Sequence, residues 1–336
     1  MQRVSQTNDF SDRADVRDGR EPELLGLDDL AALPGPLHLA IGVFDGIHLG
    51  HREVVGRASA AAAREGGRAA VLTFEPNPIR VIAPHAEPPP WLGTPGQTHE
   101  WLAELPGSPG LLPLRFDEAL ARLEPADFLN ALTRADVRTV AVGDDWRFGR
   151  RRAGDSGFLT HHGRKRGYAV EVVGAVEIDG GRVSSTRIRN AVRDGRLDEA
   201  ARLLGRPHTV RGTVVRGREI GREIGFPTAN VDTAGACLPP DGVWAVELGF
   251  AGRGAEAMLR GVANLGVRPT VDGRGRTLEV HALDFEGDLY GARMDVVFRE
   301  FIRPERKFAG LEALRARIEE DVRAARGVFE RAHPRG

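Results

Sequence analysis

Short apolar runs alternate with helix-like segments through the first half of this chain, and this alternation constrains the fold more than any other feature. The segment between the first two runs contains the alanine-rich stretch Ser59–Ala63, a strong helix former. Strands that alternate with helices pair in parallel through crossover helices, so the pattern predicts a Rossmann-like sheet. The predicted strands are Leu37–Val43, Arg68–Phe74, Val137–Val142 and Ala169–Val173.

Two stretches lie outside this alternation. Residues Pro84–Pro113 are rich in Pro and Gly, which predicts a loop or a lid. Residues Met1–Pro22 mix Asp and Arg with other polar residues and lack the apolar region of a signal peptide, so we expect a disordered extension. No run approaches the roughly 18 apolar residues of a membrane helix, and we expect no membrane contact.

The sequence changes character after a helix stop. Leu197–Leu204 has helical spacing, Gly205 follows it, and Pro207 comes two residues later, an arrangement that ends helices. We therefore predict one domain over residues 23–205 and a second over 206–336. In the second domain, β-like runs are separated by Gly-rich turns without helices: His208–Val215, Val243–Phe250, Met258–Leu265, Leu278–Leu283 and Met294–Ile302.

Five or six such strands in roughly 100 residues predict a small antiparallel barrel. The chain ends with apolar residues at helical spacing, which predicts an amphipathic helix packed on that barrel. These residues are Leu311, Leu314, Ile318, Val322 and Phe329.

The charge of the chain excludes some partners. The 336 residues include 47 Lys and Arg against 48 Asp and Glu, and a net charge of -1 argues against a protein that binds nucleic acid over its surface. The basic clusters Arg147–Arg152 and Arg164–Arg166 are then solvated loops or contacts to phosphate. The single cysteine, Cys237, excludes an intramolecular disulfide and fits a reducing compartment, so we expect a cytoplasmic protein.

His48-Leu49-Gly50-His51 lies between the first predicted strand and a helix-like segment that begins near Arg52. Nucleotide phosphates bind at strand ends and helix N-termini of α/β sheets, because backbone N–H groups and the helix dipole favour negative charge there. Either imidazole could instead be an ordinary surface or core histidine. The position after a strand favours nucleotide chemistry.

Three further polar stretches occupy similar positions. Thr73–Pro76 ends the second predicted strand, Gly143–Gly149 follows a later one, and Ser184–Arg189 opens a helix. Because the carboxyl ends of parallel strands gather at one edge of a sheet, we expect these stretches on the same side as His48 and His51.

The third stretch has the sequence SSTRIR. Ser185 and Thr186 can cap the helix and present hydroxyl groups to phosphate, while Arg187 and Arg189 supply positive charge. The alternative is a plain helix cap with surface arginines.

In the second half, Gly225–Asn230 has the sequence GFPTAN, the sharpest motif of this region. Mg²⁺ prefers hard oxygen ligands, and the Thr228 hydroxyl and the Asn230 carbonyl supply two of them close to a phosphate. Further on, Glu279 and His281 alternate along a predicted strand and so share one face. A lone Glu on a strand is otherwise part of a solvated face.

A tandem Arg-Glu-Ile-Gly occupies residues 218–225. Its glycines Gly217, Gly221 and Gly225 stand four residues apart in a polar sequence, which makes a membrane packing motif a poor explanation. A flexible loop that covers phosphate is the better interpretation.

Together these stretches resemble the bacterial bifunctional riboflavin kinase/FAD synthetase family. The resemblance covers about residues 36–330 and depends on the order and spacing of GVFDGIHLGH, TFEP, GDDWRFG, SSTRIR, GFPTAN, GVANLGVRPT, EVHALDFEGDLYG and IRPERKF. It implies two reactions. Riboflavin and ATP give FMN in the C-terminal domain, and FMN and ATP then give FAD and pyrophosphate in the N-terminal domain.

The resemblance also implies a Rossmann-like nucleotidyltransferase domain with the HxGH motif, followed by a six-stranded flavokinase barrel and a C-terminal helix. In the barrel, Thr228 and Asn230 would hold Mg-ATP, and Glu279 would act as general base on the riboflavin 5′-hydroxyl. In the first domain, His48 and His51 would stabilise the α-phosphate and the leaving pyrophosphate.

The motif positions imply the remaining contacts. The residues expected to bind ATP or phosphate are Gly42, Phe44, Asp45, Gly50, Asp145, Arg147, Ser185, Thr186, Arg187, Arg189, Gly217, Gly221, Gly225 and Pro227. The residues expected to bind flavin are Asn77, Arg303 and Phe308. The expected partners are riboflavin, FMN and ATP with Mg²⁺, without nucleic acid or membrane, and the chain is expected to be a monomer or weak homo-oligomer.

Two alternatives stay open at this point. The first is an enzyme with kinase activity alone, because the chain departs from the family near the expected FMN site. It has Asn77 where His is frequent and Trp146 where Phe is frequent, and Thr94 is followed four residues later by Thr98 rather than by Lys or Arg. The second is a flavin-binding regulator without turnover, although binding alone requires neither the paired imidazoles nor the barrel glutamate.

Overall fold

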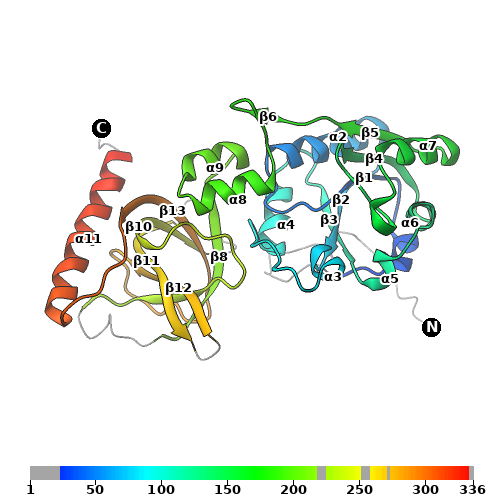
Figure 1. The fold of residues 1–336 in the computed structure, drawn as a ribbon. Helices are drawn as coiled ribbons and strands as arrows, with labels where there is room; N and C mark the ends of the chain where they lie inside the picture. Colours follow the sequence, from blue (N-terminus) through cyan, green and yellow to red (C-terminus); the bar gives the residue numbers. More distant parts are fainter. Residues whose placement is uncertain (1–22, 218–224, 251–257, 271–272, 333–336) are drawn as a thin grey trace, which may run out of the picture. The chain divides into compact units, whose positions relative to one another are not determined.

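The computed structural model describes residues 23–217, 225–250, 258–270 and 273–332, so the predicted N-terminal extension lies outside the described residues. The chain forms two compact units (Figure 1). The first comprises Met1–Pro89 and Thr94–Ser184, and the second comprises Pro90–Gly93 and Ser185–Gly336. The domain boundary predicted between residues 205 and 206 stays a prediction.

The first unit is built on a five-stranded parallel sheet in the order β3-β2-β1-β4-β5. In β1 (Leu37–Ile41), Leu37, Leu39 and Ile41 pack on one face with residues of α6 (Pro125–Leu132) and α7 (Ser156–Arg166), whereas Ala40 packs on the other face with α2 (Leu49–Glu65). Successive side chains of a strand point to opposite faces, so a continuously apolar strand needs helices on both. The predicted Rossmann-like sheet is confirmed.

The elements of this unit are η2 (Asp28–Ala32), β1 (Leu37–Ile41), α2 (Leu49–Glu65), β2 (Arg68–Glu75), α3 (Ile79–Ile82), α4 (Pro95–Ala103), β3 (Gly110–Arg115), α5 (Glu118–Ala121), α6 (Pro125–Leu132), β4 (Val137–Gly143), η3 (Arg150–Arg152), α7 (Ser156–Arg166), β5 (Ala169–Val173), β6 (Glu177–Ile178) and β7 (Gly181–Arg182).

The prediction of a loop or lid over Pro84–Pro113 is wrong for much of that range, which contains α4 and the start of β3. Helix α4 begins with a capping box. Thr94 Oγ1 accepts a hydrogen bond from the Gln97 N–H at 3.2 Å, and Gln97 Oε1 accepts one from the Thr94 N–H at 3.0 Å. With Pro95 at the first helical position, this is a strong helix start that the Pro and Gly content concealed.

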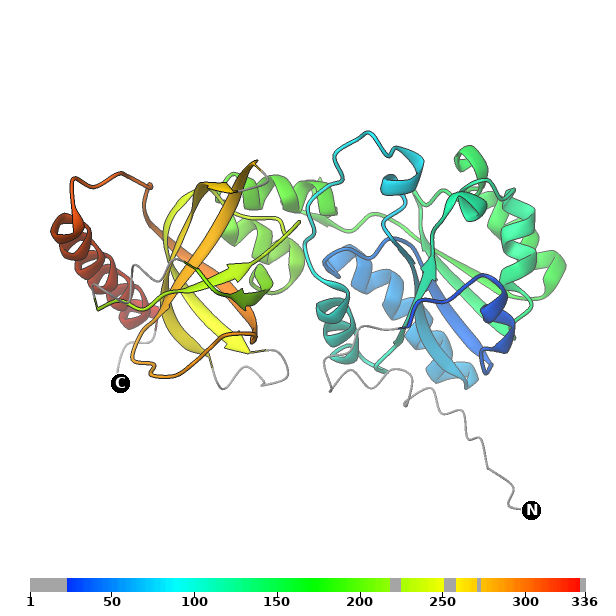
Figure 2. The same cartoon turned by 90° about the horizontal axis from the view of Figure 1, so that it is seen from below.

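The second unit contains a closed antiparallel barrel in the order β10-β11-β12-β9-β8-β13, which Figure 2 shows from another side. The predicted six-stranded barrel is confirmed. The strand that was not among the five predicted ranges is β9, which begins inside the GFPTAN motif and ends just after it. The elements of this unit are α8 (Ser185–Arg193), α9 (Leu197–Leu204), β8 (Thr209–Val215), β9 (Ala229–Asp232), β10 (Gly242–Phe250), β11 (Leu259–Thr270), β12 (Gly273–Ala282), β13 (Arg293–Arg303) and α11 (Leu311–Ala332).

Successive side chains along each strand of the barrel point alternately into its interior and to its outer face. In β10, Trp244 and Val246 point into the barrel, whereas Val243 and Ala245 pack with Phe329 of α11. The predicted C-terminal helix on the barrel is therefore confirmed, and it covers the outer face of β10, β11 and β13. This alternation also fixes which polar side chains can lie on the outside of the barrel.

Residues Pro90–Gly93 belong to the second unit through backbone hydrogen bonds. The Trp91 N–H donates to the Gly235 carbonyl, and the Cys237 N–H donates to the Trp91 carbonyl, both at 2.7 Å. The Arg189 Nε–H donates to the Pro90 carbonyl at 2.8 Å. This short segment adds one β-bridge to the barrel unit.

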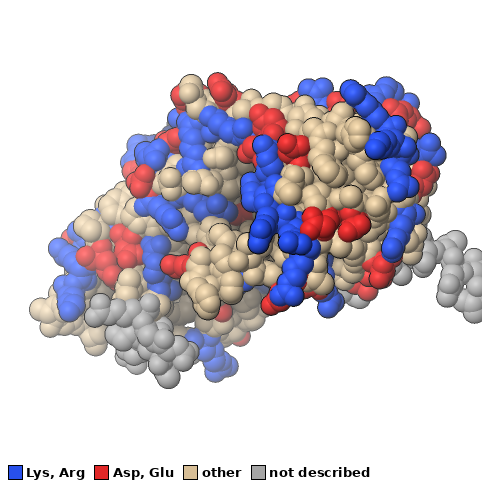
Figure 3. Space-filling view, turned by 45° about the vertical axis from the view of Figure 1, so that its right-hand side comes forward, with Lys and Arg blue, Asp and Glu red and all other residues tan. Residues whose placement is uncertain are grey.

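Charged side chains of both signs are interspersed on the face drawn in Figure 3. Many form ion pairs within one unit, such as Arg211 with Asp295 and Arg326 with Asp284. Among the described residues, no helix is both long enough and apolar enough to cross a bilayer.

His208, immediately before β8, is a buried titratable group of the second unit. Its Nε2 lies 2.8 Å from the Cys237 carbonyl oxygen, whereas Nδ1 is buried without a hydrogen-bond partner among the described residues. Burial lowers the pKa of His208 to about 4. The folded protein therefore keeps this imidazole neutral well below its ordinary pKa.

We expect the second unit to lose stability as the pH falls from about 6.5 to about 4. In that window the unfolded chain takes up a proton at His208, whereas the folded chain does not, and above it neither form is protonated. The loss is at most about 3 kcal/mol. Urea unfolding at pH 7 and pH 4.5 measures it, and His208→Gln should lack this component. An equal pH dependence in the variant would contradict the assignment.

Candidate functional site

The carboxyl edge of the parallel sheet is the first place where predicted residues gather. In the order β3-β2-β1-β4-β5, the chain leaves β1 toward β2 on one side, while β4 and β5 lie on the other. Ligands of open α/β sheets bind at such a switch point, outside the carboxyl ends of the strands. The loop after β1, with Gly42, Phe44 and Asp45, and the loop after β4 flank this position (Figure 1).

His48 and His51 lie together at the N-terminus of α2. His48 is the N-cap residue, and its Nδ1 accepts a hydrogen bond from the His51 N–H at 3.2 Å. The two rings stack with centroids 3.5 Å apart, and Phe44 packs edge-on to His51 at 5.1 Å. A neutral His48 that accepts at Nδ1 has its proton on Nε2.

Gly50 permits this stack. A Cβ at Gly50 would lie 3.1 Å from Cε1 and 3.2 Å from Nδ1 of His48, closer than ordinary packing allows. Any larger residue would push on the imidazole that caps the helix. The glycine of the HxGH motif therefore has a local steric reason, in addition to its expected place beside phosphate.

The loop after β4 is held by an arginine that the sequence did not single out. Arg182 of β7 forms ion pairs with Asp144 at 2.7 Å and with Asp145 at 3.0 Å. The hydrogen bond that Arg182 donates to Asp144 raises the pKa of Arg182. Asp145, predicted to bind ATP, thus has a cationic partner that orients its carboxylate.

The aromatic and basic residues of the same loop are arranged by stacking. Trp146 stacks on Phe148 with centroids 4.3 Å apart, and Arg147 donates to the Trp146 carbonyl at 2.9 Å. The Trp that replaces the frequent Phe therefore fits this loop. The expected contact of Arg147 with phosphate stays a prediction.

Asn77 follows β2 and takes part in a local turn. Its Oδ1 accepts a hydrogen bond from the Ile79 N–H at 3.2 Å, at the start of α3. The expected role of Asn77 in flavin binding stays a prediction, and this turn is the conformation from which it would act.

The SSTRIR segment divides between the two units, since Ser185 begins α8 of the second unit. Arg187 donates to Glu199 at 3.0 Å, and Arg189 donates to the Pro90 carbonyl. The expected contacts of Ser185, Thr186 and these two arginines with phosphate stay predictions.

In the barrel, Glu279 and Asn230 are direct partners in the β12–β9 register. Their neighbours Val280 and Ala229 point into the core, so Glu279 and Asn230 lie on the outer face. Directly opposed residues of an antiparallel pair have adjacent side chains. The structure therefore brings together the proposed base and one proposed Mg²⁺ ligand, which are 49 positions apart in the sequence.

A pocket of about 570 Å³ opens beside the GFPTAN motif, within the size range of small-molecule sites. Its wall includes Pro227, Thr228, Arg216 and Tyr290, and the Arg216 guanidinium lies 5.2 Å from the centre of the Tyr290 ring. Asn230 lies two residues beyond Thr228. The motif thus connects the pocket with the outer-face pair of Asn230 and Glu279.

His281 holds the turn that precedes β9. Its Nδ1 is 2.8 Å from the Pro227 carbonyl oxygen, and its ring packs edge-on to Phe226. The β12–β9 pairing ends with Val280 opposite Ala229, and Pro227 has no N–H with which to extend it. The His281 side chain therefore contacts the motif where the backbone pairing ends.

The glycines around this motif have different surroundings. A Cβ at Gly217 would overlap the Asn230 side-chain amide, so Gly217 makes room for that group. Gly225 has a φ of 86°, in the left-handed region that favours glycine. Gly221 lies outside the described residues, and so does most of the predicted phosphate-covering loop.

Arg303, at the end of β13, and Phe308 lie together, with the guanidinium carbon 5.7 Å from the ring centre. Arg303 also donates two hydrogen bonds, of 2.8 and 2.7 Å, to the carboxylate of Asp321 on α11. Asp321 is buried. No spacing in the sequence indicates this pair, because Asp321 lies within an amphipathic helix. The flavin contacts expected of Arg303 and Phe308 stay predictions.

The donor set of the barrel suits a hard cation. Within the part of the chain that the structure describes, no group of three or more His, Cys, Asp or Glu side chains is placed to hold a metal ion. Thr228 and Asn230 instead offer a hydroxyl and an amide oxygen. Mg²⁺ in phosphoryl-transfer sites is bound by few protein oxygens together with substrate phosphates, and these residues fit that pattern.

Comparison with known proteins agrees with both halves of the chain. A family model described as FAD synthetase matches residues 32–187, and one described as riboflavin kinase matches residues 204–329. A bifunctional riboflavin kinase/FMN adenylyltransferase from Pseudomonas fluorescens is 42% identical over 291 residues, which are 86% of this chain and 91% of the relative. The protein of the same name from Escherichia coli K12 is 41% identical over 298 residues, covering 88% and 94%.

One solved structure covers nearly the whole chain. It is a crystal structure of a macrolide-efflux protein from Streptococcus pneumoniae, with a TM-score of 0.76 and 30% sequence identity. The match covers 90% of this chain and 98% of that one.

Proposed function

Since the chain belongs to the bifunctional riboflavin kinase/FMN adenylyltransferase family, we propose that its two reactions take place at the two groups of residues described above. The protein phosphorylates riboflavin with ATP to give FMN, and it transfers the adenylyl group of a second ATP to FMN to give FAD. The assignment of each reaction to particular residues is our proposal.

The kinase reaction is assigned to the barrel, on the single observation that Glu279 directly opposes Asn230. ATP occupies the pocket beside Thr228, with its phosphates toward Asn230. The Glu279 carboxylate accepts the proton of the riboflavin 5′-hydroxyl as that oxygen attacks the γ-phosphorus, and ADP leaves as the bond from the γ-phosphorus to the bridging oxygen breaks. Positioning and charge neutralisation supply most of the catalysis in such a transfer.

Thr228 and Asn230 would hold Mg²⁺ at this site together with phosphate oxygens of ATP. When bound, it neutralises charge on the β- and γ-phosphates. Two further residues shape the GFPTAN motif without holding the metal. His281 holds the Pro227 carbonyl, and Gly217 makes room for the Asn230 amide, so both act on the shape of the motif.

The adenylyl transfer is assigned to the carboxyl edge of the parallel sheet. The FMN phosphate is already a competent nucleophile, so the site needs stabilisation of charge rather than a strong base. His48 and His51 donate to oxygens of the α-phosphate and of the leaving pyrophosphate, at a helix N-terminus that also favours anions. Asp145 and Arg182 shape the neighbouring loop.

The proposed setting follows from the substrates. Riboflavin, FMN and ATP are substrates of these families, and ATP is most abundant inside cells, so a cytoplasmic enzyme is proposed. Cys237 is the single cysteine of the sequence and its thiol is buried, which is compatible with a reducing compartment. A monomer or weak homo-oligomer is proposed from the sequence alone.

A two-product assay tests the proposal. Purified protein with riboflavin, ATP and Mg²⁺ should form FMN first and then FAD, with pyrophosphate released in step with FAD, as followed by chromatography with fluorescence detection. Removal of Mg²⁺ with EDTA should stop both steps, and added Mg²⁺ should restore them. Accumulation of FMN without FAD would contradict the proposed adenylyl site, given the substitutions at Asn77 and Thr98.

A further inference from the structure

Three polar residues form a row across neighbouring strands on the outer face of the barrel. Glu279 of β12 is opposed by Asn230 of β9 on one side and by Asn264 of β11 on the other. The residues that flank Asn264, Ala263 and Leu265, belong to the barrel core, so Asn264 points outward like Glu279. The proposed base therefore lies between two asparagines, of which only Asn230 has an assigned role.

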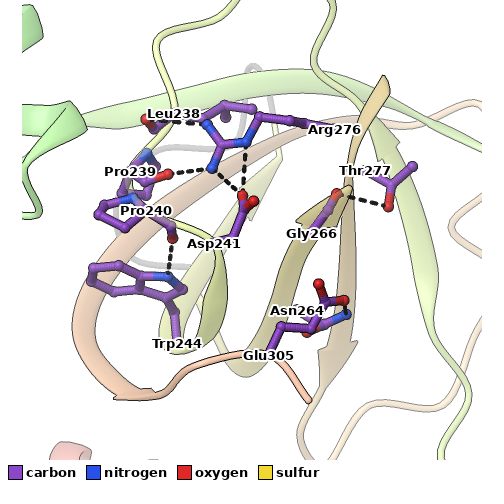
Figure 4. Close-up of polar contacts among 10 residues, drawn as sticks. All are labelled: Leu238, Pro239, Pro240, Asp241, Trp244, Asn264, Gly266, Arg276, Thr277 and Glu305. Carbon is purple, nitrogen blue, oxygen red and sulfur yellow. Dashed lines mark hydrogen bonds and ion pairs between the residues drawn. The ribbon is translucent and has the colours of Figure 1, made fainter. Parts of the chain in front are cut away.

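A second carboxylate reaches the same row from a distant segment. Glu305 lies in the connection from β13 to α11, and its Oε1 accepts a hydrogen bond from Asn264 Nδ2 at 3.4 Å (Figure 4). The Glu305 carboxylate also lies against Gly266, two residues along β11 from Asn264. A Cβ at Gly266 would overlap that carboxylate, so the position of Glu305 depends on glycine there.

The chemistry of these groups determines how the Asn264 amide is turned. An ionised carboxylate only accepts hydrogen bonds, so Glu305 selects the nitrogen end of the amide. That nitrogen has a second N–H. The carboxylate of Glu279, directly opposite on the same face, is the matching acceptor at the distance of a cross-strand pair.

We propose that Asn264 is a positioning residue for Glu279 in the kinase reaction, and that Glu305 orients the Asn264 amide for this task. This inference depends on the proposed assignment of Glu279 as the base. It gives the 304–310 connection a role at the reacting centre, because Glu305 connects that segment to the row.

The test separates turnover from substrate binding. Asn264→Ala should lower kcat for FMN formation by at least about 10-fold while KM for riboflavin and for ATP changes little, because a misplaced base loses turnover more than affinity. Asn264→Asp has nearly the same shape without the N–H donors and should be equally impaired. A role in packing alone would be retained in Asn264→Asp, so full activity of that variant would overturn the proposal.

Variants of Glu305 and Gly266 test the orienting step. Glu305→Ala should lower kcat several-fold, and Glu305→Gln should restore most of it, because the Gln carbonyl still accepts from Asn264. Gly266→Ala should resemble Glu305→Ala, and the double variant should be no worse than either, since both remove one contact. Additive losses would overturn the role of Glu305. Glu300→Gln, which removes an exposed carboxylate paired with Arg331, is the matched control and should retain kcat.

One comparison distinguishes the two levels of the proposal. If Glu279→Gln retains FMN formation, the assignment of the base fails, and the role of Asn264 fails with it. If Glu279→Gln is inactive while the Asn264 variants have the kcat of the unmodified protein, only the further inference fails. Thermal unfolding of each variant shows whether the fold is retained.

Discussion

Replacement of Glu279 by Gln is expected to abolish FMN formation from riboflavin, while FAD formation from supplied FMN continues at the rate of the unmodified protein. Gln retains the size and the carbonyl of the side chain but cannot take up the hydroxyl proton. General bases contribute about 100- to 10,000-fold, so we expect a loss in that range. Separate assays with riboflavin and with FMN as the flavin substrate measure the two steps.

This result depends on the position of Glu279 on the outer face of β12. Because the side chain points away from the barrel core, its neutralisation removes no core contact, and the unfolding midpoint should change little. Glu300→Gln serves as control, since it makes the same chemical change on β13 of the same unit. Loss of both activities in Glu279→Gln would contradict separate sites for the two reactions.

Much of the fold was predictable because it depends on local patterns. Alternating apolar runs and alanine-rich segments indicated the parallel sheet, and the loss of helices after Gly205 indicated the barrel. The errors have equally local causes. The Pro and Gly content of Pro84–Pro113 outweighed the Thr94–Gln97 capping box, so the interpretation missed α4 and the start of β3.

The candidate sites were predictable only in part, because strand register is not visible in a single sequence. The motifs identified Asn230 and Glu279 separately, but only pairing shows that they are neighbours and that Asn264 flanks Glu279 on the other side. Contacts made by distant loops were equally hidden. Neither Arg182 beside Asp145 nor Glu305 beside Asn264 follows a spacing rule.

The structure also adds physical reasons to residues first selected by motif. Gly50 allows the His48 ring to stack on His51, and Gly217 allows the Asn230 amide its place. Asn77 forms a local turn in which its side-chain oxygen accepts a hydrogen bond from the Ile79 N–H. These contacts explain why the residue type is required locally, and the assays decide whether it also contacts a substrate.

The paired imidazoles should be required for FAD formation alone. We expect His48→Ala combined with His51→Ala to lower the rate of FAD and pyrophosphate formation from FMN and ATP by at least about 100-fold, because loss of one preorganised donor typically costs that much. FMN formation from riboflavin should be unchanged, since the kinase residues lie on the barrel. Both rates are measured on the same preparation.

Alanine at position 48 also removes a helix cap, and a second double variant separates that effect from catalysis. His48 accepts the His51 N–H as the N-cap of α2, a contact whose loss costs about 1 kcal/mol. Asn is a favoured N-cap residue, so His48→Asn with His51→Gln should keep the stability of the helix while removing both imidazoles. If this variant regains FAD formation, the histidines matter only as structure. If it stays inactive with a normal unfolding midpoint, and the exposed control His161→Ala is fully active, their proposed role at the phosphates is supported.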